Sequence, residues 1–487
     1  MKFIIPITII CDCFVGFSQT NFCGTTIQDQ QSSINLQAQY QNSYNPDAAT
    51  VYVPLMVHNV SNNLSLGFYA AWNLFESLCT LNEDFQPSGI QFYLEKDFNY
   101  IKNTAWNDHD EFWVGEQMMR QSNFKNMINC YLVANPAGNC GYFTYGGDGV
   151  ALNKSCLGKK SHTWAHELGH YFSLPHTFFG WEGIAYSNSK ETIEYQSQVT
   201  TNIENVNRDF CNNQADRFCD TEPDYISNRW TCGGDGFSNN KLRDTRDSTF
   251  RVDGSLFMSY SNDDCMSRFS NEQMDDMNQN YQGPRSALKR SNVVPKFISK
   301  TGIQLNYPID SVETLTNHVV FSWEKITNAK YYVLQISRTV NFTIVVKNLL
   351  LTDHFVEIDS LIQGKNYWWR VRAFSEFDFC GTESEVGTFK TKEIVTSTNV
   401  ELNHESYIVP NPASSFGLVQ INSSVTNQIN TEILIHDLNG KVFTPKSIIL
   451  NPNSILVELG YLPDGLYFLS NQNAKASHVY KLIVKNK

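Results

Sequence analysis

The most constraining feature of this sequence is the segment of residues 163–176, Thr-Trp-Ala-His-Glu-Leu-Gly-His-Tyr-Phe-Ser-Leu-Pro-His. On a helix, His166 and His170 lie about one turn apart on the same face, so their imidazoles can bind one tetrahedral ion. Pro175 cannot continue the helix, and the turn that it imposes can bring His176 back as a third ligand. The segment therefore predicts a helix that ends before Pro175 and presents three imidazoles to one metal ion.

The other side of this predicted helix is apolar, because Trp164, Leu168 and Tyr171 fall there and can seat it on a core. Three neutral ligands leave one tetrahedral position for water, whose pKa zinc lowers towards about 7. Glu167 follows the first ligand directly, so it is placed to take the proton of that water and pass it to a leaving amine. We therefore predict one catalytic Zn²⁺ and the hydrolysis of peptide bonds in protein or peptide substrates.

Two other interpretations compete with this prediction. A pair of histidines at this spacing can be held inside a core, but only 11 of the 487 residues are histidine. A third histidine at a required position is then roughly a 2% event, which argues against chance. The second alternative is a cell-surface adhesin with a structural zinc site. A structural site has no use for a carboxylate beside an open coordination position, so Glu167 favours the hydrolase.

The segment resembles the zinc-binding motif of the metzincin metalloproteases. Tyr171-Phe172 together with His176-Thr177-Phe178 is most similar to the pappalysin branch. The resemblance implies a secreted zinc endopeptidase with an α+β catalytic domain, in which a twisted mixed sheet packs against the zinc helix.

Residues 256–266 resemble the Met-turn region of the same family. Met258 stands where that family has the methionine that forms an apolar floor under the zinc site. Tyr260 corresponds to the tyrosine that stabilises the oxyanion of the tetrahedral intermediate in relatives, a role that suits a phenol donor. Plain core packing is the alternative for both residues.

The cysteine-bearing stretch from Cys211 to Cys265 resembles a pappalysin region that contains an Asp-Thr-Pro sequence, here Asp220-Thr221-Glu222-Pro223. By this resemblance we expect a disulfide between Cys232 and Cys265, although spacing alone does not fix connectivity. A structural Ca²⁺ in this acidic stretch is implied in the same way.

Two positions depart from the family pattern. Ser173 stands where a glycine usually ends the zinc helix, and a non-glycine residue in a left-handed conformation costs about 1 to 2 kcal/mol. Ser259 replaces the aspartate that commonly follows the Met-turn methionine, so its partner is not evident from the sequence.

Residues 19–48 are polar and lack a periodic apolar pattern, which indicates a pro-segment rather than a core element. Within it, residues 21–25 resemble the pappalysin motif in which a thiolate occupies the open zinc position. The resemblance implies that Cys23 keeps the enzyme latent. The alternative is that Cys23 is half of a disulfide.

Strands at residues 51–57, 90–94, 127–133 and 149–152, with a helix at 68–81, predict an α+β catalytic domain at 49–292. By the metzincin resemblance, the strand at 149–152 is expected to be the edge strand on which an extended substrate pairs. An ordinary edge strand is the alternative.

Export is predicted by the first residues, because Met1-Lys2 and the apolar run 3–10 are typical of a signal peptide at 1–18. A lipid anchor on Cys11 is the alternative, but the bulky Ile10 precedes that cysteine. The net charge of −12 without a basic block argues against nucleic acid as a partner. No later run is apolar enough for a transmembrane segment.

Two small all-β sandwich domains are predicted after the catalytic domain. Residues 300–393 resemble a fibronectin type III domain, with Tyr367, Trp369, Val371 and Ala373 on a core face and Trp368 pointing outward, and we interpret this domain as a spacer. Residues 404–487 resemble the C-terminal sorting domain of type IX secretion substrates, with a hairpin signal at Asn439-Gly440. This resemblance implies the secretion machinery as a partner and a secreted or surface-attached protein.

Overall fold

The computed structural model describes the chain at residues 21–37, 49–187, 203–314, 319–392, 407–414, 417–422, 433–438, 440–451, 454–471 and 479–485. The predicted signal peptide, residues 1–18, and the alternative anchor at Cys11 lie outside these ranges. The described residues divide into two compact units. The first unit holds those within 1–312, 323–357 and 366–390, and the second unit holds those within 313–322, 358–365 and 391–487.

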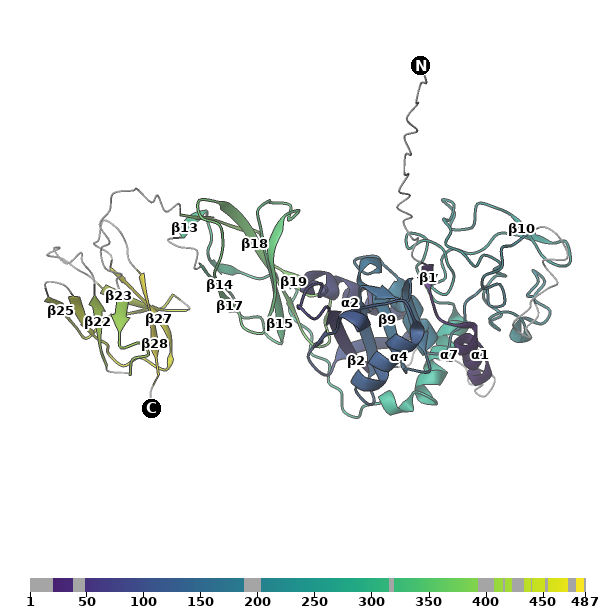
Figure 1. The fold of residues 1–487 in the computed structure, drawn as a ribbon, viewed down its shortest axis with the longest axis horizontal. Helices are drawn as coiled ribbons and strands as arrows, with labels where there is room; N and C mark the ends of the chain where they lie inside the picture. Colours follow the sequence, from purple (N-terminus) through teal and green to yellow (C-terminus); the bar gives the residue numbers. More distant parts are fainter. Residues whose placement is uncertain are drawn as a thin grey trace, which may run out of the picture. The chain divides into compact units, whose positions relative to one another are not determined.

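A seven-stranded sheet forms the centre of the first unit (Figure 1). Its hydrogen-bonded order is β1-β8-β9-β6-β2-β3, with β4 pairing β2, and only β8 is antiparallel to its neighbour β9. The strands are β1 (Asn21–Cys23), β2 (Val51–Ser61), β3 (Ile90–Leu94), β4 (Asn99–Lys102), β6 (Ile128–Val133), β8 (Asn139–Thr144) and β9 (Gly149–Asn153).

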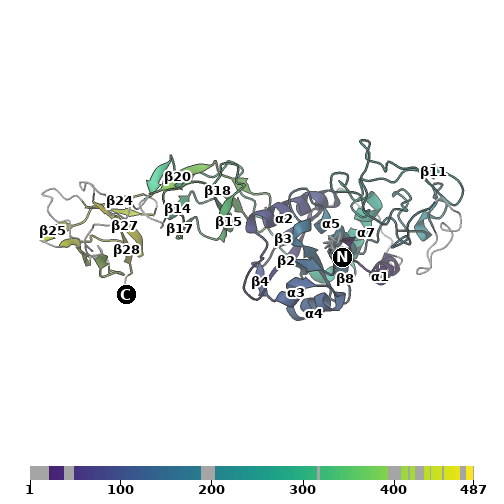
Figure 2. The same ribbon diagram turned by 45° about the horizontal axis from the view of Figure 1, so that its top comes forward.

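Helices cover both faces of this sheet (Figure 2). Alternation along β6 directs Cys130 and Leu132 to the core under α2 (Ala71–Phe85) and α5 (Thr163–Tyr171), whereas Tyr131 and Val133 face α4 (Phe112–Ser122). The remaining helices are α1 (Ile27–Gln37), α3 (Thr104–Asn107) and α7 (Asn271–Gln282). The short 3-10 helices are η1 (Gln86–Ser88), η2 (Lys154–Cys156), η3 (Cys211–Asn213) and η4 (Ser286–Leu288).

Helix α2 begins three residues later than the apolar stripe predicts. The side chain of Asn59 on β2 binds both the amide and the carbonyl of Tyr69, which keeps the chain extended up to Ala70. Such a side-chain contact from a distant strand is invisible to periodicity, which explains the shifted boundary.

The expectation that residues 149–152 form the edge strand is wrong. Strand β9 lies between β8 and β6, because the Gly146-Gly147-Asp148 turn folds β8 back on β9 as a hairpin. Strand β8 is therefore next to the edge, and β1 covers it. Small two-stranded pairs complete this region: β5 (Asp108–His109) with β7 (Asn135–Pro136), and β10 (Leu242–Arg243) with β11 (Thr249–Phe250).

The predicted fibronectin-like region contains the short strands expected of it. Along β18 (Asn366–Phe374) the side chains of Tyr367, Trp369, Val371 and Ala373 are buried and Trp368 is only partly so, which confirms the predicted alternation. Strands β16 (Val345–Leu351), β15 (Tyr331–Ser337), β18 and β20 (Gly387–Thr391) are neighbours in that order, and β19 (Thr382–Glu383) pairs β18. The other strands are β12 (Leu305–Tyr307), β13 (Val312–Thr314), β14 (Val319–Trp323) and β17 (Phe355–Ile358).

Several of these strands pack against the first sheet's helices within the first unit. The ring of Phe75 on α2 stacks on Phe374 of β18 with centroids 3.9 Å apart. A disulfide joins Cys79 on α2 to Cys380. These contacts were not expected, because a domain that acts only as a spacer needs no core shared with its neighbour.

In the second unit, two four-stranded antiparallel sheets enclose one apolar core. One sheet has the order β21-β22-β26-β25 and the other β24-β23-β27-β28. Strands β23 and β24 pair as the predicted hairpin, with Gly440 in a left-handed conformation. The strands are β21 (Tyr407–Val409), β22 (Leu418–Asn422), β23 (Ile433–Asp437), β24 (Val442–Phe443), β25 (Ser447–Asn451), β26 (Ser454–Glu458), β27 (Gly465–Asn471) and β28 (Val479–Val484).

Candidate metal centre

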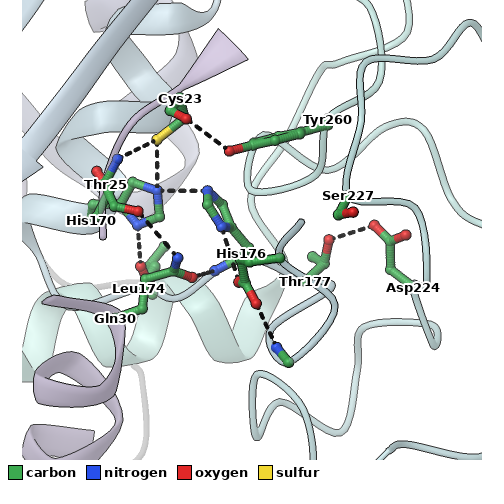
Figure 3. Close-up of polar contacts among 12 residues, drawn as sticks. Cys23, Thr25, Gln30, His170, Leu174, His176, Thr177, Asp224, Ser227 and Tyr260 are labelled. Carbon is green, nitrogen blue, oxygen red and sulfur yellow. Dashed lines mark hydrogen bonds and ion pairs between the residues drawn. The ribbon is translucent and has the colours of Figure 1, made fainter. Parts of the chain in front are cut away.

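Three imidazoles meet at the end of helix α5. The Nε2 atom of His170 lies 3.2 Å from Nε2 of His166 and 3.1 Å from Nε2 of His176. All three side chains are buried, and Figure 3 shows His170 and His176 converging below Cys23. The structure thus gathers the three predicted ligand residues at one point.

The outer nitrogens of these rings determine which tautomer is present. Nδ1 of His166 donates to the carbonyl oxygen of Phe257 at 2.6 Å, and Nδ1 of His170 donates to that of Leu174 at 2.7 Å. Because a carbonyl only accepts, the proton is on Nδ1 and each Nε2 presents a lone pair. Lone pairs facing one another at this distance repel unless a cation lies among them, and burial also lowers the pKa of each ring.

The third ring is held by a carboxylate that the sequence does not reveal. Nδ1 of His176 lies 3.3 Å from Oε1 of Glu182, whose Oε2 accepts from the amide of Gly180. Burial raises the pKa of Glu182 to about 7. A carboxylate six residues after a histidine carries no sequence signal, because the loop conformation alone brings the two together.

The turn after helix α5 keeps the left-handed conformation despite its serine. Ser173 has a φ of 76°, and its hydroxyl accepts from Asn280 and contacts Tyr145. The amide of Leu174 bonds to the carbonyl of Gly169, which closes the helix and directs the chain towards His176. Hydrogen bonds to its hydroxyl offset part of the conformational cost of Ser173.

Glu167 lies beside the imidazoles with one carboxylate oxygen unsatisfied. Its Oε1 is buried and has no hydrogen-bond partner among the described residues, whereas Oε2 accepts from the hydroxyl of Thr25 at 3.3 Å. Burial raises the pKa of Glu167 to about 8. A Cβ on Gly141 of strand β8 would stand 2.7 Å from Cγ of Glu167, so the close approach of strand and base requires glycine there.

The N-terminal segment closes the open side of this cluster (Figure 3). Sγ of Cys23 is 3.6 Å from Nε2 of His170 and 3.5 Å from Oε2 of Glu167. Thr25 donates to Glu167 and also accepts from the amide of Phe143 on β8. Gln30 on α1 accepts from the amide of His176. Cys23, Thr25 and Gln30 therefore contact His170, Glu167 and His176 respectively.

Helix α1 is buried mainly through polar contacts, which explains why residues 27–37 show no apolar periodicity. Ile34 is the buried apolar side chain of α1, whereas Gln30 and Ser33 are buried polar ones. The carbonyl of Ile34 accepts from Arg217. Polar packing of this kind leaves no hydrophobic stripe for a sequence pattern to reveal.

Met258 and Tyr260, which were predicted to belong to a Met-turn, lie close to the histidine cluster. Met258 is fully buried, and a Cβ on Gly169 of α5 would be 2.4 Å from its sulfur, so methionine and helix are in close contact. The hydroxyl of Tyr260 donates to the carbonyl oxygen of Cys23 at 3.3 Å. Ser259 donates to Asp224 at 2.8 Å, and this carboxylate supplies the partner that the sequence did not reveal.

Cys232 and Cys265 form a disulfide in the structure. Further disulfides join Cys140 to Cys156 and Cys211 to Cys219. Cys23 forms no disulfide in the structure, and with the buried Cys130 it is one of two free cysteines among the described residues.

The C-terminal part of the chain matches a known family. Residues 407–485 match the family described as the secretion system C-terminal sorting domain. This domain identifies the chain as exported, either to the exterior or to the cell surface. Among the described residues no helix is both long and apolar enough to cross a bilayer.

The curated relatives are fungal proteins named extracellular metalloprotease. One from Colletotrichum graminicola is 30% identical over 188 residues, which cover 34% of this chain and 65% of the relative. One from Pyricularia oryzae is 28% identical over 152 residues, covering 27% and 52%. The chain thus spans about half to two thirds of the length of these relatives.

Among solved structures, the chain is similar to the fn3 domain of human collagen alpha-1(XX) chain at 16% identity, covering 23% of this chain and 97% of that domain with a TM-score of 0.16. A score this low supports no conclusion about the fold.

Proposed function

We propose that this exported protein is a zinc-dependent endopeptidase with His166, His170 and His176 as metal ligands and Glu167 as general base. The observation that carries the proposal is the convergence of three Nε2 atoms beside a buried oxygen of Glu167 that has no hydrogen-bond partner in the described part of the chain. The relatives named extracellular metalloprotease support the same activity. We further propose the metzincin type and its pappalysin branch, on the zinc helix and the Met258 floor beneath it.

The geometry of the cluster fits zinc. Zn–N bonds of 2.0–2.1 Å in a tetrahedron separate ligand nitrogens by about 3.3 Å, close to the 3.1 and 3.2 Å between the imidazoles. Imidazole donors suit zinc, whereas calcium and magnesium prefer oxygen. When bound, zinc supplies an acidified water at neutral pH and polarises a substrate carbonyl.

The chain's own groups then perform the proton transfers. Glu167 takes a proton from the attacking water and returns it to the leaving nitrogen, and its unpaired Oε1 is available for this. Tyr260 donates a hydrogen bond to the carbonyl oxygen on which negative charge develops, as it now donates to the carbonyl of Cys23. An extended substrate pairs with β8 where β1 now lies.

We propose that Cys23 holds the enzyme latent. Tetrahedral zinc with a sulfur at 2.3 Å and a nitrogen at 2.05 Å separates the two ligands by about 3.6 Å, which equals the distance from Sγ of Cys23 to Nε2 of His170. Residues 19–48 act as the pro-segment in this proposal. Release of the sulfur frees the fourth position for water.

We also propose a structural calcium ion in the acidic stretch near residues 204–222. Glu204 is buried and both its carboxylate oxygens lack a partner among the described residues, and the nearby Asp216 is buried as well. Burial raises the pKa of both carboxyl groups, and a cation would offset this penalty. Calcium in the purified protein, and a lower melting temperature after its removal by a calcium chelator, would support the ion; a calcium-free protein with unchanged melting would contradict it.

The adhesin with a structural zinc site is the alternative function, and the relatives do not favour it. The test uses the full chain with Cys23→Ala, so that the sulfur does not block the site. Glu167→Gln in this background should lower casein cleavage by about 10²- to 10⁴-fold without loss of zinc, whereas Glu116→Gln on α4 should change little. Equal cleavage by the Glu167→Gln protein and its parent would exclude the proposed base.

A further inference from the structure

The side chain of Phe22 fills a recess beside the metal centre. The ring is 7% exposed and meets His166 edge-on with centroids 4.9 Å apart, and Tyr260 at 5.3 Å. Two aromatic rings of the site thus surround a third ring that belongs to the N-terminal segment.

A cation closes the remaining side of this recess. The guanidinium carbon of Arg229 lies 3.8 Å from the centroid of the Phe22 ring, within the range of a cation–π contact. One end of the guanidinium binds Asp263 at 3.1 Å, and Asp263 also accepts from the amide of His162. The other end, Nη1, is buried without a partner among the described residues, so the cation faces the recess.

The position of Phe22 relative to the sheet indicates which part of a substrate the recess would bind. Phe22 lies in β1, which pairs with β8 at Asn21–Asn139 and Cys23–Gly141. This is the edge on which an extended substrate would pair, and Cys23 next to Phe22 reaches the imidazoles. Phe22 therefore occupies the place of a side chain adjacent to the reacting bond.

We propose that the recess formed by His166, Tyr260 and Arg229 is a substrate subsite that selects an aromatic side chain next to the cleaved bond. The inference rests on the proposed endopeptidase function and deepens it. The face of an aromatic ring attracts the buried guanidinium of Arg229 without carrying a full negative charge. A full charge is not needed, because Asp263 already neutralises part of the positive charge of Arg229. Selection of an acidic side chain by Arg229 is the competing outcome of the test.

The first experiment does not depend on catalysis. In the full chain, the rate at which a chromogenic disulfide reagent modifies Cys23 reports release of β1, because Cys130, the other free cysteine among the described residues, is buried. Phe22→Leu should raise this rate about 3- to 30-fold through loss of the cation–π contact. In the Arg229→Met background the same change should have less than about a twofold effect, because the cation is already gone.

The matched control is Arg251→Met, since Arg251 lies over the Phe237 ring and pairs with Asp235. In that background Phe22→Leu should keep its full effect. An equal effect of Phe22→Leu with and without Arg229 would overturn the aromatic subsite.

The second experiment compares peptides that differ only by Phe, Leu or Glu beside the cleaved bond, using the full chain with Cys23→Ala. The expected result is a kcat/KM for Phe at least about threefold above that for Leu, lost in Arg229→Met. This ratio does not depend on the active fraction of each preparation. Preference for Glu, or a Phe-to-Leu ratio unaffected by Arg229, would overturn the proposal. Failure to cleave any peptide with zinc bound, even after limited proteolysis has released residues 19–48, would instead contradict the proposed hydrolysis, and the thiol experiment on the intact chain then decides the subsite alone.

Discussion

Oε1 of Glu182 lies 3.3 Å from Nδ1 of His176, so this imidazole is oriented by a carboxylate whereas His166 and His170 are oriented by main-chain carbonyls. A main-chain acceptor is retained in any variant, but a carboxylate is removed by one substitution. Substitution of Glu182 can therefore weaken the proposed metal site without removing one of the proposed ligands.

Glu182→Ala should therefore lower zinc affinity by about 10- to 100-fold, which is usual for loss of a group that orients a ligand histidine. Glu182→Gln keeps an acceptor oxygen and should lose less. Competition with a chromogenic zinc chelator measures both. Glu383→Ala, at an exposed ion pair with Arg370, is the control. Unchanged affinity in Glu182→Ala would show that His176 does not depend on this contact.

Gly141→Ala tests the packing of strand β8 against Glu167, the proposed general base. The new Cβ would stand 2.8 Å from Oε1 and 2.7 Å from Cγ of Glu167, so the carboxylate must move. A displacement near 1 Å can cost about 100-fold in rate. In the Cys23→Ala chain we expect a loss of this size with zinc content intact. Gly234→Ala, where a Cβ meets no atom within 4 Å, is the control. Full activity in Gly141→Ala would contradict the close approach.

Asp224 connects the loop after the third imidazole to the Met-turn. Its Oδ2 accepts from the hydroxyls of Thr177 at 2.7 Å and Ser259 at 2.8 Å (Figure 3 shows the first). Asp224→Ala leaves two buried hydroxyls unpaired, so we expect a loss of about 2 to 4 kcal/mol in the free energy of unfolding. Denaturant titration measures it. Thr177→Val with Asp224→Ala should recover part of the loss, because one unpaired hydroxyl is then absent.

The disulfide between Cys79 and Cys380 closes a loop across a sequence separation of 301. Its removal by Cys79→Ala with Cys380→Ala should lower the free energy of unfolding by about 2 to 5 kcal/mol. The bridge from Cys211 to Cys219 spans a separation of only 8, so its removal should cost less in the loop-entropy account. Thermal unfolding of both double variants makes the comparison, and equal losses would contradict this ordering.

His58 should make stability depend on pH. It is buried and stacked on Tyr131 at 4.0 Å, and burial lowers its pKa to about 4. Because the folded pKa is below the unfolded value near 6.5, the unfolded state binds more protons as pH falls from 6.5 to 4. This group alone should then remove about 3 kcal/mol of stability between pH 7 and pH 4. In His58→Gln that component should disappear from the difference between denaturant titrations at the two pH values.

Local patterns predicted the parts of this molecule that depend on neighbours in sequence. The i, i+4 spacing of the histidines and the helix-breaking Pro175 predicted a helix that ends before Pro175, and α5 is that helix. The alternation of side chains along β18 predicted which of them are buried. Both follow from backbone geometry that repeats every few residues. The strand at residues 90–94 was predicted with its observed bounds for the same reason.

Contacts across long separations could not be predicted in this way. The placement of Phe22 on Arg229 and of Thr25 on Glu167 depends on β1 adding to the far side of β8, which no periodicity in residues 19–48 indicates. The expectation that residues 149–152 form the edge strand was likewise wrong, because an edge strand and an inner strand of a hairpin have the same local pattern.

The sequence by itself determined which residues can offer nitrogen lone pairs, a carboxylate and a thiol, since side-chain chemistry and helical spacing are local properties. Only the tertiary structure decided that Cys23 reaches the imidazoles, that Glu182 orients His176 and that an arginine lies over Phe22. These pairings arise from the packing of distant segments into one core, where the balance of burial over the whole chain selects a single arrangement.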